Sequence, residues 1–162
     1  KKKKNIAART GVRSITFDHI NEAAAALVED NEHFASLWDY TEFDRRRFLL
    51  YLLHREENST DLMRLGVIEA KLEEAGVELR EEVVIADLEY LRELELVDLH
   101  GESSGAWYSL TIPMMGQWLD SQQDYEVLRS RARAEAEDIS GKLDEISGLE
   151  DELEESKDNG DE

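Results

Sequence analysis

Histidine and carboxylate side chains are the groups in this sequence whose chemistry could support catalysis or metal binding. The four histidines, at positions 19, 33, 54 and 100, never lie at i, i+4 on one expected helix, the spacing by which two imidazoles share a metal. The 39 acidic residues are so numerous that close pairs arise by chance and indicate no acid–base pair. Cysteine is absent, which excludes disulfides, thiolate metal sites and a thiol nucleophile. We therefore expect no catalytic residue and no metal site.

Phosphate binding has two candidate segments. Gly101–Gly105 (GESSG) has the composition of a phosphate loop, but it joins two expected strands, which favours a turn. The patterns GxxxxGK[ST] and GxGxxG are both missing from the sequence, so no nucleotide cofactor is expected. Arg45, Arg46 and Arg47 are the only internal basic run. On a helix they point in three directions 100° apart, which favours separate solvated or salt-bridged roles.

The charge of the chain is strongly acidic. Its 162 residues carry a formal net charge of -20, and 41% of them are hydrophobic, enough for a packed domain. After residue 4 the only lysines are Lys71, Lys142 and Lys157. An acidic surface repels phosphates and so disfavours non-specific nucleic-acid binding. Adaptation to high salt is a second explanation of this composition, and concentrated salt would screen the repulsion.

Apolar periodicity predicts a mostly α-helical chain with one β-hairpin. Thr41 with Asp44 resembles a capping box for a helix from Glu42, and that helix is apolar nearly all round, as a central buried helix is. Pro113 suits the first turn of the helix after the hairpin. The expected helices span residues 17–30, 32–39, 42–55, 61–75 (ended by Gly76), 80–94 and 113 towards 136, and the expected strands span 96–100 and 106–112.

The expected helix Arg80–Leu94 has two contrasting faces. At 100° per residue its larger apolar side chains gather on one side, as a core face. The opposite arc holds Glu82, Ile85, Ala86, Glu89, Arg92 and Glu93. A helix that reads the DNA major groove needs Arg, Lys, Asn or Gln on this arc, and glutamates buried against phosphates are repelled. The pattern favours a modest protein contact through Glu82, Ile85, Glu89 and Glu93, or else a solvated face.

The two ends of the chain differ from its middle. Residues 1–13 are predicted to be a flexible basic lead-in, and the absence of a starting methionine favours a fragment of a longer protein. Near the other end, the similar units ISGKLDE and ISGLEDE place five apolar residues at the 3–4 spacing of a short coiled coil: Ile139, Leu143, Ile146, Leu149 and Leu153. Gly141 and Gly148 each cost about 1 kcal/mol inside a helix. We therefore expect a disordered acidic tail over 139–162, with an ordered helix as the alternative.

Three parts of the chain, within residues 14–122, resemble the C-terminal module of AAA+ and STAND-type ATPases related to the origin-recognition class. They are ITFDHINEAAAALVEDNEHFASLWD (Ile15–Asp39), FDRRRFLLYLLHRE (Phe43–Glu56), and the pair LRELELVDLHG (Leu91–Gly101) and WYSLTIPMMGQWL (Trp107–Leu119). The resemblance implies a winged-helix module of a larger ATP-driven switch, which contacts DNA, the neighbouring ATPase domain or an effector protein. None of the family's nucleotide-binding residues is carried over to this chain.

These observations together predict the fold class: mostly α with a small β-hairpin, as a winged helix-turn-helix domain preceded by two helices and followed by a helical extension and an acidic tail. The expected division is a lead-in at 1–13, a helical segment at 14–38, the winged helix at 39–122, the extension at 123–138 and the tail at 139–162. The expected core contains Leu49, Leu52, Leu53, Leu88, Leu91, Leu96, Trp107, Leu110 and Trp118.

The expected function is a non-catalytic regulatory or protein-interaction module, the C-terminal part of a larger AAA+/STAND-type ATPase. Its partner would be its own ATPase domain or an effector protein, in the cytoplasm, without a cofactor. No apolar run reaches 18 residues, so no membrane span is expected. The alternative is a DNA-binding winged helix for transcription, replication or defence, which the charge disfavours. It would use the wing and the basic residues, namely Arg45, Arg46, Arg47, Arg92, Ser103 and Ser104.

Overall fold

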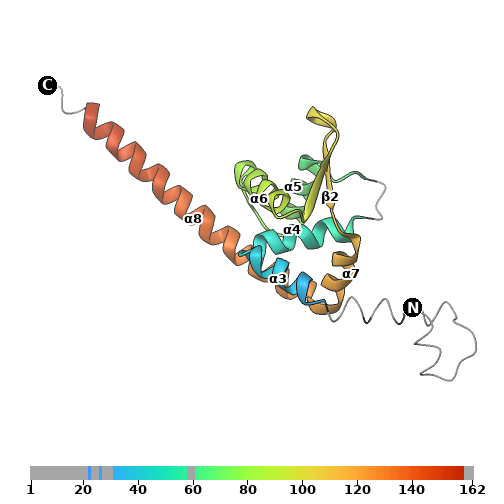
Figure 1. The fold of residues 1–162 in the computed structure, drawn as a ribbon. Coiled ribbons are helices and arrows are strands. Elements are labelled where there is room, and N and C mark those ends of the chain that lie inside the picture. The colour runs from blue at the N-terminus through green and yellow to red at the C-terminus, as the bar shows by residue number, and fades with distance from the viewer. Residues whose placement is uncertain (1–21, 23–25, 27–30, 58–60, 159–162) are drawn as a thin grey trace, which may run out of the picture.

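The chain forms a helical domain with one β-hairpin, from which a long C-terminal helix projects (Figure 1). The structure, a computed structural model, describes residues 31–57 and 61–158, with side chains as far as Glu150, and the single positions Glu22 and Ala26. In chain order the elements are α3 (Glu32–Tyr40), α4 (Asp44–Arg55), α5 (Leu65–Glu74), α6 (Glu81–Glu93), β1 (Val97–His100), the 3-10 turn η1 (Ser103–Gly105), β2 (Trp107–Leu110), α7 (Pro113–Gln122) and α8 (Tyr125–Asp158).

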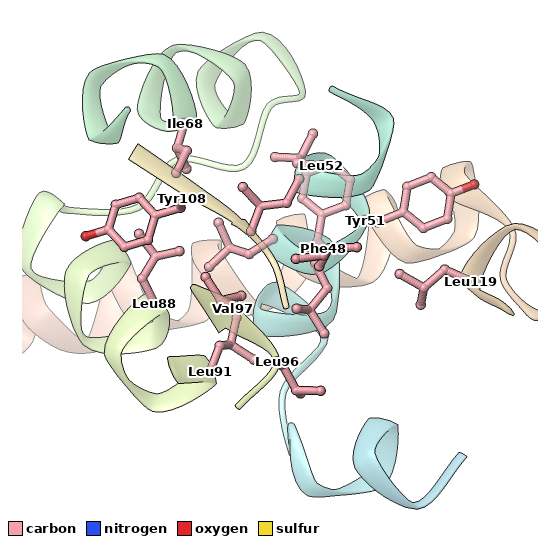
Figure 2. Close-up of a cluster of buried hydrophobic side chains, with 14 of the residues drawn as sticks. Phe48, Tyr51, Leu52, Ile68, Leu88, Leu91, Leu96, Val97, Tyr108 and Leu119 are labelled. Carbon is pink, nitrogen blue, oxygen red and sulfur yellow. The ribbon is translucent and has the colours of Figure 1, made fainter. Parts of the chain in front are cut away.

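Helix α4 is the central helix, as its apolar circumference predicts. Its residues from Phe48 to Leu53 are all buried. Figure 2 shows side chains of this helix packed against Ile68 of α5, Leu88 of α6 and Tyr108 of β2. A helix that is buried on every side has neighbours on every side, so α4 fixes the relative positions of the other elements.

Helices α4, α5 and α6 and the hairpin β1–β2 form the predicted winged helix. The two strands are antiparallel, with Val97 opposite Leu110 and His100 opposite Trp107. The backbone N–H of Tyr108 also donates to the carbonyl of Met63, over 2.9 Å. This bond ties the segment before α5 to the edge of β2 that does not pair with β1.

Two tight helix ends set the path from α5 to α6 and from α6 to β1. After α5, Gly76 takes a φ of 75°, and the N–H of Val77 donates to the carbonyl of Leu72 over 2.9 Å. This pattern is a Schellman cap, for which glycine is favoured. Glu95 ends α6 in the same way with a φ of 58°. A residue with a Cβ pays about 1 kcal/mol for that conformation, and the burial of the following Leu96 offsets the cost.

The predicted core is confirmed except at Trp107. Leu49, Leu52, Leu53, Leu88, Leu91, Leu96, Leu110 and Trp118 are all buried. Trp107 is half-buried, because side chains alternate along a strand and its neighbours Tyr108 and Leu110 take the core side. The Trp107 ring stacks instead on His100 of the opposite strand, with 4.1 Å between the ring centroids.

The predicted starts of two helices are wrong. The Thr41 side chain does not cap α4, because its hydroxyl donates to the carbonyl of Trp38 over 2.7 Å. Helix α4 begins at Asp44 rather than Glu42. Helix α5 begins at Leu65 rather than Asp61. The helix 32–39 is confirmed as α3, with Asn31 as its N-cap. The lead-in at 1–13 lies outside the described residues, as does the helix predicted over 17–30 except for Glu22 and Ala26, which are helical.

The C-terminal part departs furthest from expectation. The helix that starts at Pro113 does not run on towards Ala136, because Gln123 is extended and α8 begins anew at Tyr125. Residues 139–158, which we expected to be disordered, are the distal part of α8. Packing of its first turns on α4 supplies the helix nucleus, after which each further residue is added at low cost. The pair Lys142–Asp138 at i, i+4 adds a small local contribution.

Candidate interaction surface

The outer arc of α6 is exposed and acidic. Glu82, Ile85, Glu89 and Glu93 lie together on it at the surface, and the Ile85 side chain is 37% exposed. Arg92 donates to both carboxylate oxygens of Glu89, over 2.8 and 2.9 Å. The one base on this arc is therefore held by one of its three acids. What remains is a small apolar centre ringed by carboxylates.

The inner side of α6 carries an acid that sequence reasoning missed. Asp87 is 1% exposed and accepts from two arginines of α4: Arg45 Nε at 2.7 Å and Arg46 Nε at 2.7 Å. Arg45 also donates through Nη2 to the other oxygen, over 3.2 Å. Both arginine side chains are only 12% exposed. A buried carboxylate is stable only with such partners, so this cluster locks α6 onto α4.

Aromatic rings enclose the same arginines. The Arg46 guanidinium lies 3.7 Å from the centre of the Tyr90 ring and 4.8 Å from that of Phe43. Arg45 lies 4.2 Å from the Phe43 centroid. Stacking on aromatic faces suits the planar, weakly hydrated guanidinium. The two charges are thereby held between rings and carboxylates and are turned away from solvent.

Helix α8 completes this cluster from a distance of 90 residues along the chain. Glu135 accepts from the backbone N–H groups of Asp44 and Arg45, over 2.9 and 3.0 Å. These are among the unpaired donors at the start of α4, where a negative charge is favoured by the helix dipole. Glu135 also lies 3.7 Å from the Arg45 Nη1 atom. The cap that sequence reasoning assigned to Thr41 is thus supplied by another helix.

The residues proposed for DNA contact do not form one surface. Arg45 and Arg46 are held by Asp87, and Arg47 is 20% exposed and pairs with Asp44 over 3.1 Å. Arg92 pairs with Glu89 on the acidic arc. Ser103 and Ser104 are exposed in the wing, away from the arginine cluster. The predicted salt-bridged role of the arginine run is confirmed, but its members are not separate, because Arg45 and Arg46 share Asp87.

The wing itself carries no base. Its tip, residues 101–106 (GESSGA), contributes Glu102 as the only charged side chain. Ser103 takes a φ of 53° within η1. His100 Nε2 lies 2.8 Å from the Ser109 hydroxyl, so the imidazole is engaged within the hairpin. A wing that contacts phosphates relies on Arg, Lys or polar donors. Ser103 and Ser104 supply hydroxyl donors here, but the Glu102 carboxylate beside them repels phosphate.

A second polar network joins α4 to α7. His54 Nε2 lies 2.8 Å from Asp120 Oδ2, and the Tyr51 hydroxyl donates to Asp120 Oδ1 over 3.3 Å. Burial raises the pKa of the Tyr51 hydroxyl above its usual value, and the Asp120 carboxylate raises that pKa further. The imidazole also lies against the backbone of Gly116, where a Cβ atom would be 2.0 Å from Nδ1. The network therefore holds two helices in unusually close contact.

The described surface has open hollows. One of about 350 Å³ brings together Arg55, Lys71 and Arg129. There Lys71 pairs with Glu56 over 3.2 Å, Arg129 pairs with Glu126, and Arg55 lies over the Tyr125 ring.

Another hollow, of about 480 Å³, lies where the α5–α6 connection meets α8. Its arginine, Arg133, pairs with Glu137 of the same helix over 3.0 Å. Among the residues that the structure describes, no three His, Asp or Glu side chains are grouped to hold a metal ion. No helix in the described ranges is long and apolar enough to cross a membrane.

Comparison with known proteins gives no match: neither a family model nor a curated protein nor a solved structure is similar to this chain. The winged-helix fold defines the class of protein by its architecture alone, and one fold serves many functions.

Proposed function

We propose that this chain is a non-catalytic winged-helix module that binds protein through the outer arc of α6. The observation that carries the proposal is the division of charge between the two sides of that helix. Its one base, Arg92, is held in an ion pair, as are Arg45 and Arg46 of α4. Glu82 and Glu93 remain exposed around Ile85. An apolar centre with a charged rim is the usual anatomy of a protein contact.

The resemblance to AAA+/STAND-type modules supports a context for this contact. We propose that the module belongs to a larger cytoplasmic ATPase and that its partner is the ATPase domain or an effector protein. The coding sequence upstream of Lys1 tests this context. A Walker A motif there, GxxxxGK[ST], would support it, and a start codon directly before Lys1 would contradict it.

DNA binding is the alternative, and its electrostatic requirement makes it testable. Phosphate contacts release counterions, so genuine DNA binding weakens steeply as salt rises. We expect no binding of a labelled duplex by about 10 µM protein at about 0.1 M salt, because the net charge of -20 opposes it. Fluorescence anisotropy measures this directly. Micromolar or tighter binding with a steep salt dependence would refute the protein-interaction proposal.

A charge-reversal pair makes the same assay diagnostic of the α6 surface. Glu82→Lys with Glu93→Lys places two bases on the exposed arc of an otherwise unchanged winged helix. If acidity alone prevents docking in a groove, this variant gains DNA binding, with a salt slope of about -1.8 in log–log form for two added phosphate contacts. The matched control is Asp39→Lys with Glu145→Lys, which makes the same change of charge on the exposed surfaces of α3 and α8. Equal gains in both variants would show that net charge, rather than this arc, governs binding.

A further inference from the structure

Helix α8 has one apolar face that the domain covers only in part. Near its start, Leu128, Ala132 and Ala136 are at most 3% exposed and belong to the core. The helix then leaves the domain and projects into solvent (Figure 1). The buried face of the first half continues into the second half, which the domain still touches where Arg80 pairs with Asp144 over 3.2 Å.

The continuation keeps the spacing of the buried part. Ile139 and Leu143 are half-buried, and Ile146 and Leu149 are 53% and 59% exposed. The steps from Ala132 to Ala136, Ile139, Leu143 and Ile146 are four, three, four and three residues. This alternation is the heptad pattern in which positions a and d form the seam of a coiled coil. The seam thus begins inside the domain and emerges from it unpaired.

Charge is distributed around this seam in a way that identifies the partner. With Ile139 at d and Leu143 at a, the acids nearest the seam residues in sequence fall at the outer positions b and c: Glu137, Asp138, Asp144 and Glu145. The flanking positions e and g carry Ser140, Lys142, Ser147 and Leu149. Those flanking positions decide which helices can pair, and here they present no acid. Glu150 occupies the next a position, where the seam would need an apolar residue, so the apolar seam ends there.

We propose that the projecting part of α8 pairs with the same part of a second copy of this chain. A basic helix would find no acidic flank to recognise, whereas an identical helix meets a matching apolar seam. The one charged flanking residue, Lys142, is already paired with Asp138 of its own helix. The acids at b and c lie off the seam, and Glu137, Asp138 and Asp144 are each paired with a base of the same chain. The repulsion that remains between two copies is screened by salt. This inference concerns a surface separate from the α6 arc and goes beyond the proposed function.

Sedimentation equilibrium on the full chain tests the pairing. The seam is short, so we expect a weak dimer, with a mass that rises from 18.6 kDa towards twice that value over about 1 to 200 µM protein. Because each copy carries -20, association should be tighter at about 1 M salt than at about 0.1 M. A wild-type chain that stays monomeric across the whole range at both salt concentrations would overturn the proposal.

Two alanine pairs locate the contact. Ile146→Ala with Leu149→Ala removes the exposed seam side chain at d and the apolar side chain that flanks it at g. The pair keeps the helix, because alanine is the best helix former. Gly141→Ala with Gly148→Ala is the matched control: these glycines have nothing within 4 Å of an added Cβ and lie at the outer f position. We expect the seam variant to raise the dimer dissociation constant at least tenfold and the control to leave it unchanged or lower. Unaltered association in the seam variant, with helicity retained by circular dichroism, would overturn the proposal.

Discussion

Asp87 is the side chain on which the docking of α6 depends most. It is 1% exposed and accepts from Arg45 and Arg46, so Asp87→Ala leaves two guanidinium groups without their main partner. Removing one member of a buried ion pair costs about 3 to 5 kcal/mol. Arg46 keeps Glu42 at 3.3 Å and its contacts with aromatic rings. We therefore expect the lower end, a loss of about 3 kcal/mol in the free energy of unfolding.

Urea unfolding followed by tryptophan fluorescence measures this loss. With a slope of about 1.5 kcal/mol per molar urea, a loss of about 3 kcal/mol lowers the midpoint by about 2 M. Asp98→Ala is the control, since this acid lies exposed on β1 and a surface change costs about 0.5 kcal/mol or less. Asp87→Asn keeps the shape and an acceptor and should fall between the two, which keeps the test usable if the alanine variant does not fold.

A clear numerical outcome would refute the reasoning about this cluster. If Asp87→Ala destabilised the chain by no more than Asp98→Ala, the two arginines would not depend on the buried carboxylate, and their stacking on the rings would suffice. The lock between α4 and α6 would then be apolar. Equal losses from Asp87→Asn and Asp87→Ala would instead assign the whole effect to charge.

Three further predictions concern the contacts of α4 and the buried tyrosines. Gly116→Ala should destabilise the chain by about 2 kcal/mol or more in urea unfolding, because its Cβ would lie 2.0 Å from an imidazole atom and overpacking is costly. Gly66→Ala is the control: it has open space around it and should stabilise the chain by up to about 1 kcal/mol. A change of the same sign in both variants would contradict the close contact. Glu135→Ala should cost about 2 kcal/mol in the same assay, since it removes a charged acceptor from two backbone donors at a helix start; a change below about 0.5 kcal/mol would show that the cap is dispensable. The raised pKa values of Tyr51 and Tyr108 contribute stability that is fully present below the unfolded pKa of about 10 and is lost as pH rises through the folded values. Tyrosinate absorbance should therefore show two late-titrating groups. A free energy of unfolding that stays constant above about pH 10 would contradict this.

Local pattern was enough to predict most of the elements. The apolar circumference of residues 48–53 predicted a central helix, and α4 is buried there. The turn residues of GESSG and Pro113 predicted the hairpin and the start of α7, which are observed. The tail was misjudged because Gly141 and Gly148 weigh against an isolated helix, whereas α8 is nucleated by packing its first turns on α4.

The candidate site was only half visible in the sequence. The helical wheel placed Glu82 and Ile85 on an outer arc, and both are exposed. Asp87 was overlooked, although a signal for it existed: it stands three residues after Val84 and four before Leu91, on the core stripe. A carboxylate on a buried stripe needs cationic partners, and the arginine run was the available source.

By itself, the sequence determined most of the helices and both strands between residues 32 and 122, and that the outer arc of α6 is acidic, because periodicity and turn chemistry act between near neighbours. Only the tertiary structure decided how the charges pair. Asp87 meets Arg45 and Arg46 across more than 40 residues, and Glu135 reaches the start of α4 across 90. Such partners are chosen by the packing of whole helices, which no local pattern contains. That packing withdraws the arginines from the surface and leaves the seam of α8 exposed.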